Sequence, residues 1–253
     1  MLILILVTSQ VVSGDQSSGK SSVLEAITEI PFPRKENLCT RFATEITLRR
    51  APTASIQTKI IPDKVRPANE KTKLETFSKS IRDFNELPAL MEAATQLMGL
   101  GGDTSRAFSR DVLSIEIAGP QRPHLTLIDL PGLIHSENKS QSKEDVELIR
   151  NLVDVSAESY CSILANDRLV WSDANTTCQD YIKEKRTIVM AVVSAKNDYA
   201  NQIILKKCRD VDPKGHRTLG IITKPDFLDP GSENETLWLE LASNKVSHRS
   251  RDM

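Results

Sequence analysis

A glycine-bounded segment near the start of the chain carries the residue types of a phosphate-binding loop. Gly14, Gly19, Lys20 and Ser21 fit GxxxxGK(S/T) between an apolar run and a helix-forming segment. In such a loop the backbone N–H groups surround phosphate oxygens, which the positive end of the helix dipole also attracts. The lysine reaches the β and γ phosphates, and the serine hydroxyl binds Mg²⁺. The candidate nucleotide-binding residues in this segment are Gly14, Asp15, Gln16, Ser17, Ser18, Gly19, Lys20, Ser21 and Ser22.

The glycines and the two polar side chains of the loop have separate tasks. Gly14 lets the chain leave the strand where a side chain would obstruct it, and Gly19 lets the backbone approach the nucleotide closely. We expect Lys20 and Ser21 to face solvent when no ligand is bound. A chance Gly/Ser turn between a strand and a helix is the alternative interpretation.

Two further polar motifs stand at the ends of apolar runs. Asp129 and Gly132 form a DxxG motif, in which the carboxylate holds Mg²⁺ through water and the glycine N–H meets the γ-phosphate. Thr223, Lys224 and Asp226 belong to a TKPD motif. Its lysine stem can lie along a purine ring, and its carboxylate can accept both N–H donors of guanine. Adenine has no such donor pair, so the motif favours GTP over ATP.

Thr40 lies in the loop between the first expected helix and the next expected strand. It is the candidate for a switch threonine that completes the Mg²⁺ shell when the γ-phosphate is present, and a solvated loop threonine is the alternative. The residue after Gly132 is Leu133, so the glutamine that positions water there in Ras-type GTPases is absent. The predicted metal ligands are Ser21, Thr40 and, through water, Asp129.

Strand and helix patterns alternate along the chain. This alternation predicts an α/β fold with a mostly parallel sheet and helices on both faces. The expected strands are residues 1–7, 41–50, 55–61, 109–119, 124–132, 186–195 and 217–226. The expected helices are residues 20–28, 74–84, 87–98, 142–153, 199–211 and 233–244, with 63–73 as a charged connection.

Composition narrows the class of protein. The chain has 253 residues of which 39% are hydrophobic, which is enough for a globular core. A net charge of -1 argues against a nucleic-acid-binding surface or a polybasic membrane patch. The four cysteines lack CxxC spacing and indicate free thiols in a reducing compartment, so we expect a cytoplasmic protein. No run approaches the roughly 18 apolar residues of a membrane span.

The motifs GDQSSGKSS, LCTR, DLPG and TKPD, in that order, resemble the GTP-binding domain of the dynamin superfamily. The similarity is greatest to fungal dynamin-like and interferon-induced Mx-like proteins. It implies a P-loop GTPase domain that uses GTP and Mg²⁺ in a mechanochemical protein of membrane remodelling or organelle fission. It also implies a homodimer across the nucleotide face, higher assembly, indirect contact with membranes or filaments, and a peripheral place on organelle membranes.

The resemblance also implies how hydrolysis is assisted. Gln16, inside the phosphate loop, would orient the attacking water, and Ser17 would help to hold a monovalent cation. A solvated loop amide is the alternative for Gln16. The catalytic residues implied are Gln16, Ser17, Lys20 and Thr40.

The resemblance covers most of residues 11–245, so we expect residues 1–253 to be one GTP-binding domain that is incomplete at its C-terminus. A further guanine-site loop would follow the last helix, and residues 246–253 are a tail unlike the family. By the same resemblance, we expect the chain to lack the stalk and the membrane-contacting elements of the family. Two alternatives are an inactive nucleotide-binding or interfering fragment, and an ATP-using P-loop enzyme such as a kinase, which the TKPD motif disfavours.

Residues 155–179 interrupt the resemblance, although the sequence on both sides is similar to the family. Joining Asp154 to Asp180 restores a helical spacing of apolar residues that the segment breaks. Its first codons can contain a splice donor, GTRAGT, and its last codon can be CAG, the usual acceptor end. We interpret the segment as an intron translated in frame, and a tolerated surface insertion is the alternative.

Deleting residues 155–179 is therefore expected to leave the melting temperature of the protein unchanged, because the segment should be loosely packed and make no ligand contacts. Thermal unfolding of the two chains, compared side by side, measures this. A lower melting temperature after deletion, or genomic DNA without splice signals at both ends of the segment, would show the interpretation to be wrong.

Overall fold

The structure is a computed structural model, and it describes residues 9–31, 40–100, 108–133, 148–149, 187–198 and 201–243. The expected features that lie wholly or largely outside these residues are the strand at 1–7, the helix at 142–153, the segment 155–179 and the tail 246–253. The phosphate loop, the DxxG motif and the TKPD motif all lie within them.

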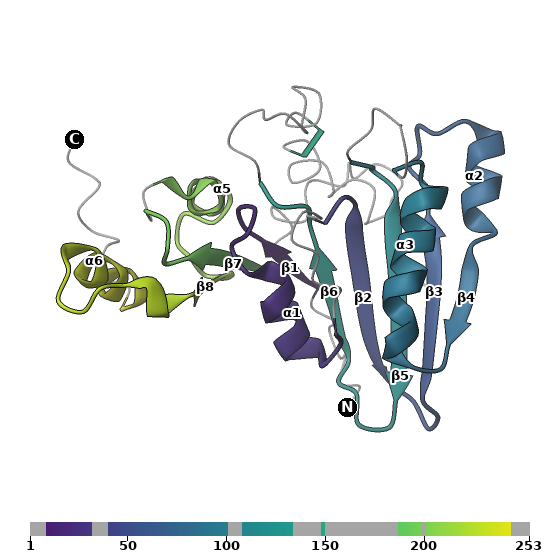
Figure 1. Cartoon of the computed structure of the whole chain (residues 1–253), viewed down its shortest axis with the longest axis horizontal. Coiled ribbons are helices and arrows are strands. Elements are labelled where there is room, and N and C mark those ends of the chain that lie inside the picture. Colours follow the sequence, from purple (N-terminus) through teal and green to yellow (C-terminus); the bar gives the residue numbers. More distant parts are fainter. Residues whose placement is uncertain are drawn as a thin grey trace, which may run out of the picture.

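In the part of the chain that the structure describes, eight strands form one sheet in the order β4-β3-β5-β2-β6-β1-β7-β8 (Figure 1). The strands are β1 (Ser9–Ser13), β2 (Ala43–Arg50), β3 (Ser55–Ile61), β4 (Ser78–Ile81), β5 (Val112–Gly119), β6 (Leu125–Asp129), β7 (Ile188–Ser194) and β8 (Thr218–Thr223). Four of the seven pairings are parallel, namely β1 with β6, β1 with β7, β2 with β5, and β7 with β8. The expected mostly parallel α/β sheet is confirmed.

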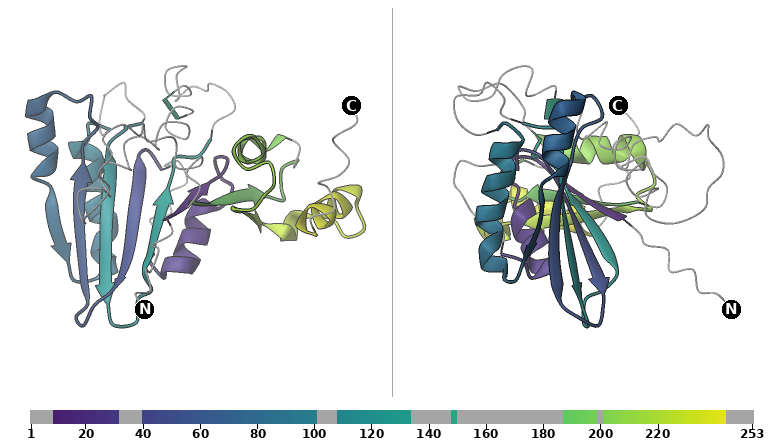
Figure 2. Two further views of the ribbon diagram at one scale, coloured as in Figure 1. Left: turned by 180° about the vertical axis from the view of Figure 1, so that it is seen from behind. Right: turned by 90° about the vertical axis from the view of Figure 1, so that its right-hand side faces the viewer.

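Helices pack on both faces of this sheet (Figure 2). The helices are α1 (Lys20–Thr28), α2 (Ala68–Glu75), α3 (Leu87–Leu97), α5 (Ile203–Val211) and α6 (Glu233–Ala242), with short 3₁₀ turns η1 (Phe84–Glu86) and η3 (Pro225–Phe227). One core joins α1, α2 and α3 to the sheet and includes Leu24, Leu74 and Leu90. The second core includes Val193, Ile204 and Trp238 and joins the sheet to α5 and α6. No helix in the described ranges is long and apolar enough to cross a lipid bilayer.

The helix expected at residues 74–84 is wrong. Helix α2 ends at Glu75, β4 follows at Ser78–Ile81 and η1 begins at Phe84. Leu74, Phe77 and Ile81 have helical spacing, and all three are buried, but each reaches the core from a different local structure. The edge of β3 offers backbone partners to β4, and such tertiary pairing overrides a short periodic pattern.

Helix α1, which begins at the phosphate loop, is also fixed at its far end. Arg122, from the turn between β5 and β6, donates to the carbonyl oxygen of Thr28 at 3.1 Å. The Thr28 hydroxyl donates to the carbonyl oxygen of Leu24 at 2.7 Å. A cation at a helix C-terminus is favourable because the last carbonyl groups have no helical donor. The helix is therefore held at both ends relative to the sheet.

Candidate functional site

Three loops that carry the predicted motifs follow parallel strands and meet at one edge of the sheet. Val12 of β1 pairs with Asp129 of β6, and Ser194 of β7 pairs with Thr223 of β8. The carboxyl ends of these strands therefore lie together, which is where open α/β sheets bind ligands. In the sheet order β6-β1-β7-β8, the DxxG motif follows β6, the phosphate loop follows β1 and the TKPD motif follows β8. The phosphate loop therefore lies between the other two motifs.

The lysine of the phosphate loop is hydrogen-bonded to the backbone of the same loop. Lys20 Nζ donates to the carbonyl oxygens of Gly14 at 3.1 Å and Asp15 at 3.2 Å. Lys20 is 7% exposed, so the expectation that it faces solvent is wrong, whereas Ser21 is exposed as expected. The loop carbonyls give the ammonium group acceptors in place of the water it loses on burial.

Two glycines of the site are required because their neighbours approach so closely. A Cβ at Gly14 would lie 2.2 Å from the carbonyl oxygen of Val192, and a Cβ at Gly132 would lie 2.9 Å from Cα of Gln16. Gly19, the N-cap of α1, has φ of +97°, in the left-handed region that favours glycine. Only glycine lets β1 and the DxxG loop come this close to the elements beside them.

Leu133 joins the DxxG loop to the phosphate loop through its backbone. Its N–H donates to the carbonyl oxygen of Gly14 at 3.1 Å, and its own carbonyl oxygen accepts from the N–H of Gln16 at 3.0 Å. Asp15 and Leu133 also form a parallel bridge. The Leu133 side chain is buried in the second core. This residue therefore supplies packing and main-chain contacts where Ras-type GTPases have a water-positioning glutamine.

The TKPD loop is held against the phosphate loop by two side chains. The Thr223 hydroxyl donates to the carbonyl oxygen of Ser18, and Lys224 Nζ donates to that of Ser17 at 2.8 Å. Lys224 has φ of +56°, a left-handed conformation at the end of β8. Asp226 is exposed in the turn η3 that follows, where its carboxylate is accessible to a ligand.

Thr40 and Asp129 meet on the other side of the phosphate loop. Thr40 Oγ1 donates to Asp129 Oδ2 at 3.1 Å. Asp129 is 4% exposed, and its Oδ1 has no hydrogen-bond partner among the described residues. Burial raises the pKa of Asp129 to about 6, against the lowering effects of the Lys20 charge and the Thr40 hydroxyl. The site thus keeps a desolvated carboxylate with one unused oxygen.

These groups fit the predicted Mg²⁺ shell. The unused Asp129 oxygen can accept from a metal-bound water, and Thr40 presents its hydroxyl beside the same carboxylate. Ser21 is exposed in the first turn of α1. Carboxylate and hydroxyl oxygens are the ligands that Mg²⁺ prefers. Ser21, Thr40 and Asp129 are therefore the residues that would hold the cation.

The structure brings most of the predicted site residues into direct contact, although their roles toward a nucleotide stay predictions. The residues joined by hydrogen bonds or close backbone approach are Gly14, Asp15, Gln16, Ser17, Ser18, Lys20, Thr40, Asp129, Gly132, Thr223 and Lys224. Ser21, Ser22 and Asp226 are exposed at the rim. Sequence reasoning missed the part played by Leu133, because backbone hydrogen bonds leave no signal in residue type.

Comparison with known proteins decides the family. A sequence profile of the Dynamin family matches residues 11–225, which is more than half of the chain. The chain belongs to the dynamin family. The resemblance inferred from the motifs is thereby confirmed.

Several relatives of this dynamin-family chain are interferon-induced GTP-binding proteins. It is 32% identical over 241 residues to Mx1 of Oncorhynchus mykiss, covering 95% of this chain and 32% of Mx1. It is 33% identical over 240 residues to Mx of Perca fluviatilis, covering 93% of this chain and 64% of that protein. With MxE of Danio rerio it shares 32% identity over 225 residues, or 88% and 29% of the two chains. The chain thus spans about a third of the length of Mx1 and MxE.

Replacing Asp129 by Asn is expected to stabilise the nucleotide-free protein at pH 7. The carboxyl pKa rises from 3.8 to about 6 on folding, so the folded state holds more protons between these values and stability falls as the pH rises through them. At about 1.4 kcal/mol per pKa unit, the rise corresponds to about 3 kcal/mol at neutral pH. Melting temperatures of Asp129→Asn and wild type measured from pH 4 to pH 7 check this.

The gain should shrink toward pH 4, where the folded carboxyl is protonated and the unfolded carboxyl, close to its pKa of 3.8, is itself partly protonated. Asp229→Asn, the same change at an exposed loop position, is the control for loss of a carboxylate outside the buried site. An Asp129→Asn protein that melts below wild type at pH 7 would contradict the electrostatic cost assigned to this carboxylate.

Proposed function

We propose that this chain binds Mg²⁺-GTP and hydrolyses it by in-line attack of water on the γ-phosphate. The observation that carries the proposal is the pair of hydrogen bonds from Thr223 and Lys224 to the carbonyls of the phosphate loop. They hold a motif suited to guanine beside a loop suited to phosphates, at the ligand-binding edge of the sheet. The names of the Mx relatives, which are called GTP-binding proteins, support the same nucleotide.

Positioning and charge neutralisation supply the catalysis in this proposal. The N–H groups at the start of α1 and the ammonium of Lys20 hold the β and γ phosphates, since these N–H groups have no helical acceptor. Ser21, Thr40 and, through water, Asp129 would hold Mg²⁺, which would neutralise charge on the phosphate oxygens. The N–H of Gly132 would be the donor to the γ-phosphate.

Gln16 is proposed to orient the attacking water, and Ser17 to help hold a monovalent cation. The backbone of both residues is fixed, because the Gln16 N–H donates to Leu133 and the Ser17 carbonyl accepts from Lys224. Leu133 has no side-chain polar group that could position water. Ser17 is exposed, with φ of +61°, so it is open to a second copy that would complete the site by dimerising across the nucleotide face.

We also propose a mechanochemical role in membrane remodelling or organelle fission, in the cytoplasm and peripherally on organelle membranes. Membership of the dynamin family supports the role. The alternative is a nucleotide-binding or interfering protein without turnover, which the turnover experiment below distinguishes from a GTPase.

Turnover of GTP, with ATP as the control nucleotide, separates these functions. A GTPase releases phosphate from GTP alone, an inactive fragment binds GTP without turnover, and a kinase-like enzyme uses ATP.

Lys20→Ala and Ser21→Ala are both expected to abolish GTP binding, because each removes a phosphate or metal contact. Only Lys20→Ala should also lower the nucleotide-free melting temperature, since its ammonium is buried against two carbonyl oxygens. Equal melting losses would assign Ser21 a structural role.

Asp226→Asn is expected to weaken GTP binding by about 2 to 3 kcal/mol and to shift preference toward xanthosine triphosphate. The carboxylate would accept two charge-assisted hydrogen bonds from guanine, and an amide cannot accept both. Titration with both nucleotides measures the shift. Asp229→Asn, an exposed aspartate three residues further along the same loop, is the matched control and should bind as wild type. Wild-type GTP affinity in Asp226→Asn would show that the guanine assignment is wrong.

A further inference from the structure

A buried ion pair lies away from the three motif loops. Arg66, in the connection between β3 and α2, donates through Nε to Oδ1 of Asp111 at 2.8 Å and through Nη2 to Oδ2 at 2.5 Å. The Asp111 side chain is fully buried and that of Arg66 is 14% exposed. A bidentate pair of this kind fixes both the distance and the orientation of its partners. Removing one partner would leave an uncompensated buried charge.

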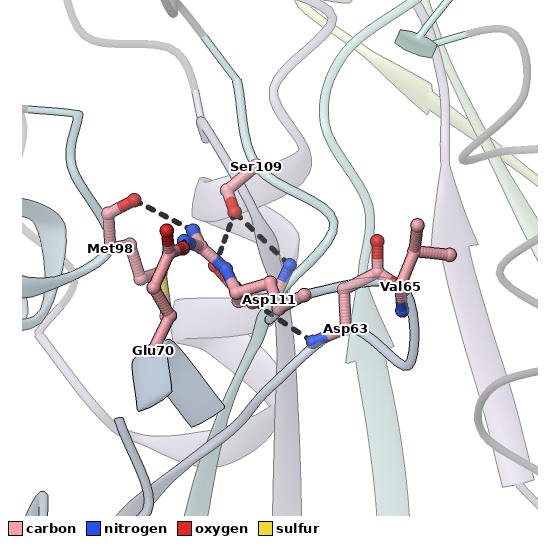
Figure 3. A network of polar contacts seen from close by, with 7 residues as sticks. Asp63, Val65, Glu70, Met98, Ser109 and Asp111 are labelled. Atoms are coloured by element: carbon pink, nitrogen blue, oxygen red, sulfur yellow. Dashed lines mark hydrogen bonds and ion pairs between the residues drawn. The ribbon is translucent and has the colours of Figure 1, made fainter. Parts of the chain in front are cut away.

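The pair is the centre of a larger network (Figure 3). Asp111 also accepts from the Ser109 hydroxyl at 2.6 Å and from the N–H of Asp63 at 2.9 Å. Arg66 Nη2 donates to the carbonyl oxygen of Met98 at the C-terminus of α3 at 2.9 Å. The start of β5, the end of α3 and the β3–α2 connection are therefore tied to one point.

The end of α3 is itself sharply defined. Gly99 has φ of +80°, its N–H donates to the carbonyl oxygen of Gln96, and the N–H of Leu100 donates to that of Thr95. This is a Schellman motif, which closes a helix with a left-handed residue. The carbonyls of Met98 and Leu100, just beyond, are left to accept from side chains.

Arg41, the residue after Thr40, is hydrogen-bonded both to the end of α3 and to the network around Asp111. Arg41 Nη1 donates to the carbonyl oxygen of Leu100 at 2.7 Å, and the carbonyl oxygen of Arg41 accepts from the N–H of Ser109 at 2.9 Å. Ser109 is the residue whose hydroxyl contacts Asp111. Thr40, one residue before, donates to Asp129. Arg66 and Asp111, 45 residues apart in the sequence, are thus joined through Ser109 to Arg41, the residue next to the candidate switch threonine.

We propose that the Arg66–Asp111 pair is a positioning element for Thr40, acting through Ser109 and Arg41. The inference rests on the proposed function, in which Thr40 completes the Mg²⁺ shell when a γ-phosphate is present. The alternative is that the pair only joins the start of α2 to the end of α3. Weakening the pair would then lower the melting temperature of the protein, with no local effect at Ser109 and equal effects on the affinities for the two nucleotides. If it positions Thr40, loosening it frees the Ser109–Arg41 contact and selectively weakens the state that contains a γ-phosphate.

Arg66→Lys is the first test, because it keeps the positive charge but cannot span both Asp111 oxygens and the Met98 carbonyl. Arg217→Lys is the control, since the Arg217 guanidinium also joins separate segments, by donating to the backbone carbonyls of Thr187 and Val211 in the other half of the sheet. Glu70→Gln removes only the negative charge of the more exposed partner of Arg66 and is a second control. Amide hydrogen exchange is measured on the nucleotide-free full chain, and affinities for GDP and GTPγS are measured with Mg²⁺.

In Arg66→Lys the Ser109 amide should exchange about tenfold faster than in wild type. The Arg217→Lys variant, compared at conditions where the two variants have similar melting temperatures, should show a smaller increase at this amide. GTPγS affinity should fall by about fivefold or more, with GDP affinity within about twofold of wild type. Unchanged Ser109 exchange, or equal losses for both nucleotides, would overturn the proposal. Asp111→Asn, if it folds, should show the same pattern more strongly. A wild type that binds neither nucleotide overturns the proposed function instead, and Ser109 exchange then decides on the anchoring alone.

Discussion

The close approach of backbone to backbone at the carboxyl edge of the sheet is the constraint on which the site depends. Gly14 lies against the carbonyl of Val192 on β7, and Gly132 lies against Gln16 in the phosphate loop. Neither position has room for a Cβ, so any side chain there would push two strands or two loops apart. With glycine at both, Leu133 can bond to the phosphate loop through its backbone on both sides. The geometry for phosphate binding is therefore built into main-chain packing before any ligand arrives.

The motif residues could be predicted from the sequence because their chemistry is local. A phosphate loop needs its glycines, lysine and serine within a few residues, and the parallel strands then bring the DxxG and TKPD motifs to the same edge. The burial of Lys20 could not be foreseen, because it depends on carbonyl groups turned inward by the loop itself. The helix expected at 74–84 failed since apolar spacing cannot show that β3 has an open edge. The Arg66–Asp111 contact joins distant residues with no pattern in either segment.

The site carries an electrostatic cost that a purely structural design would avoid. Asp129 is buried in a place that raises its pKa to about 6, and one of its oxygens has no partner among the described residues. A buried polar atom without a partner is costly, and native proteins keep such atoms mainly where a ligand will satisfy them. Lys20 offsets part of this cost through its charge. A cation bound beside Asp129 would therefore offset this cost and stabilise the folded protein.

Thr40 lies in the chain between its contact with this buried carboxylate and the hydrogen bonds of Arg41. On one side its hydroxyl contacts Asp129, and on the other its neighbour Arg41 is bonded to the end of α3 and to Ser109. A switch residue needs two arrangements of similar free energy, and a ligand can choose between them only by its differential affinity. A support that is fixed by a buried ion pair narrows the positions open to Thr40, so that less conformational entropy is lost when a γ-phosphate and Mg²⁺ select one of them. Precision at the metal shell would then come from residues that touch neither the nucleotide nor the cation.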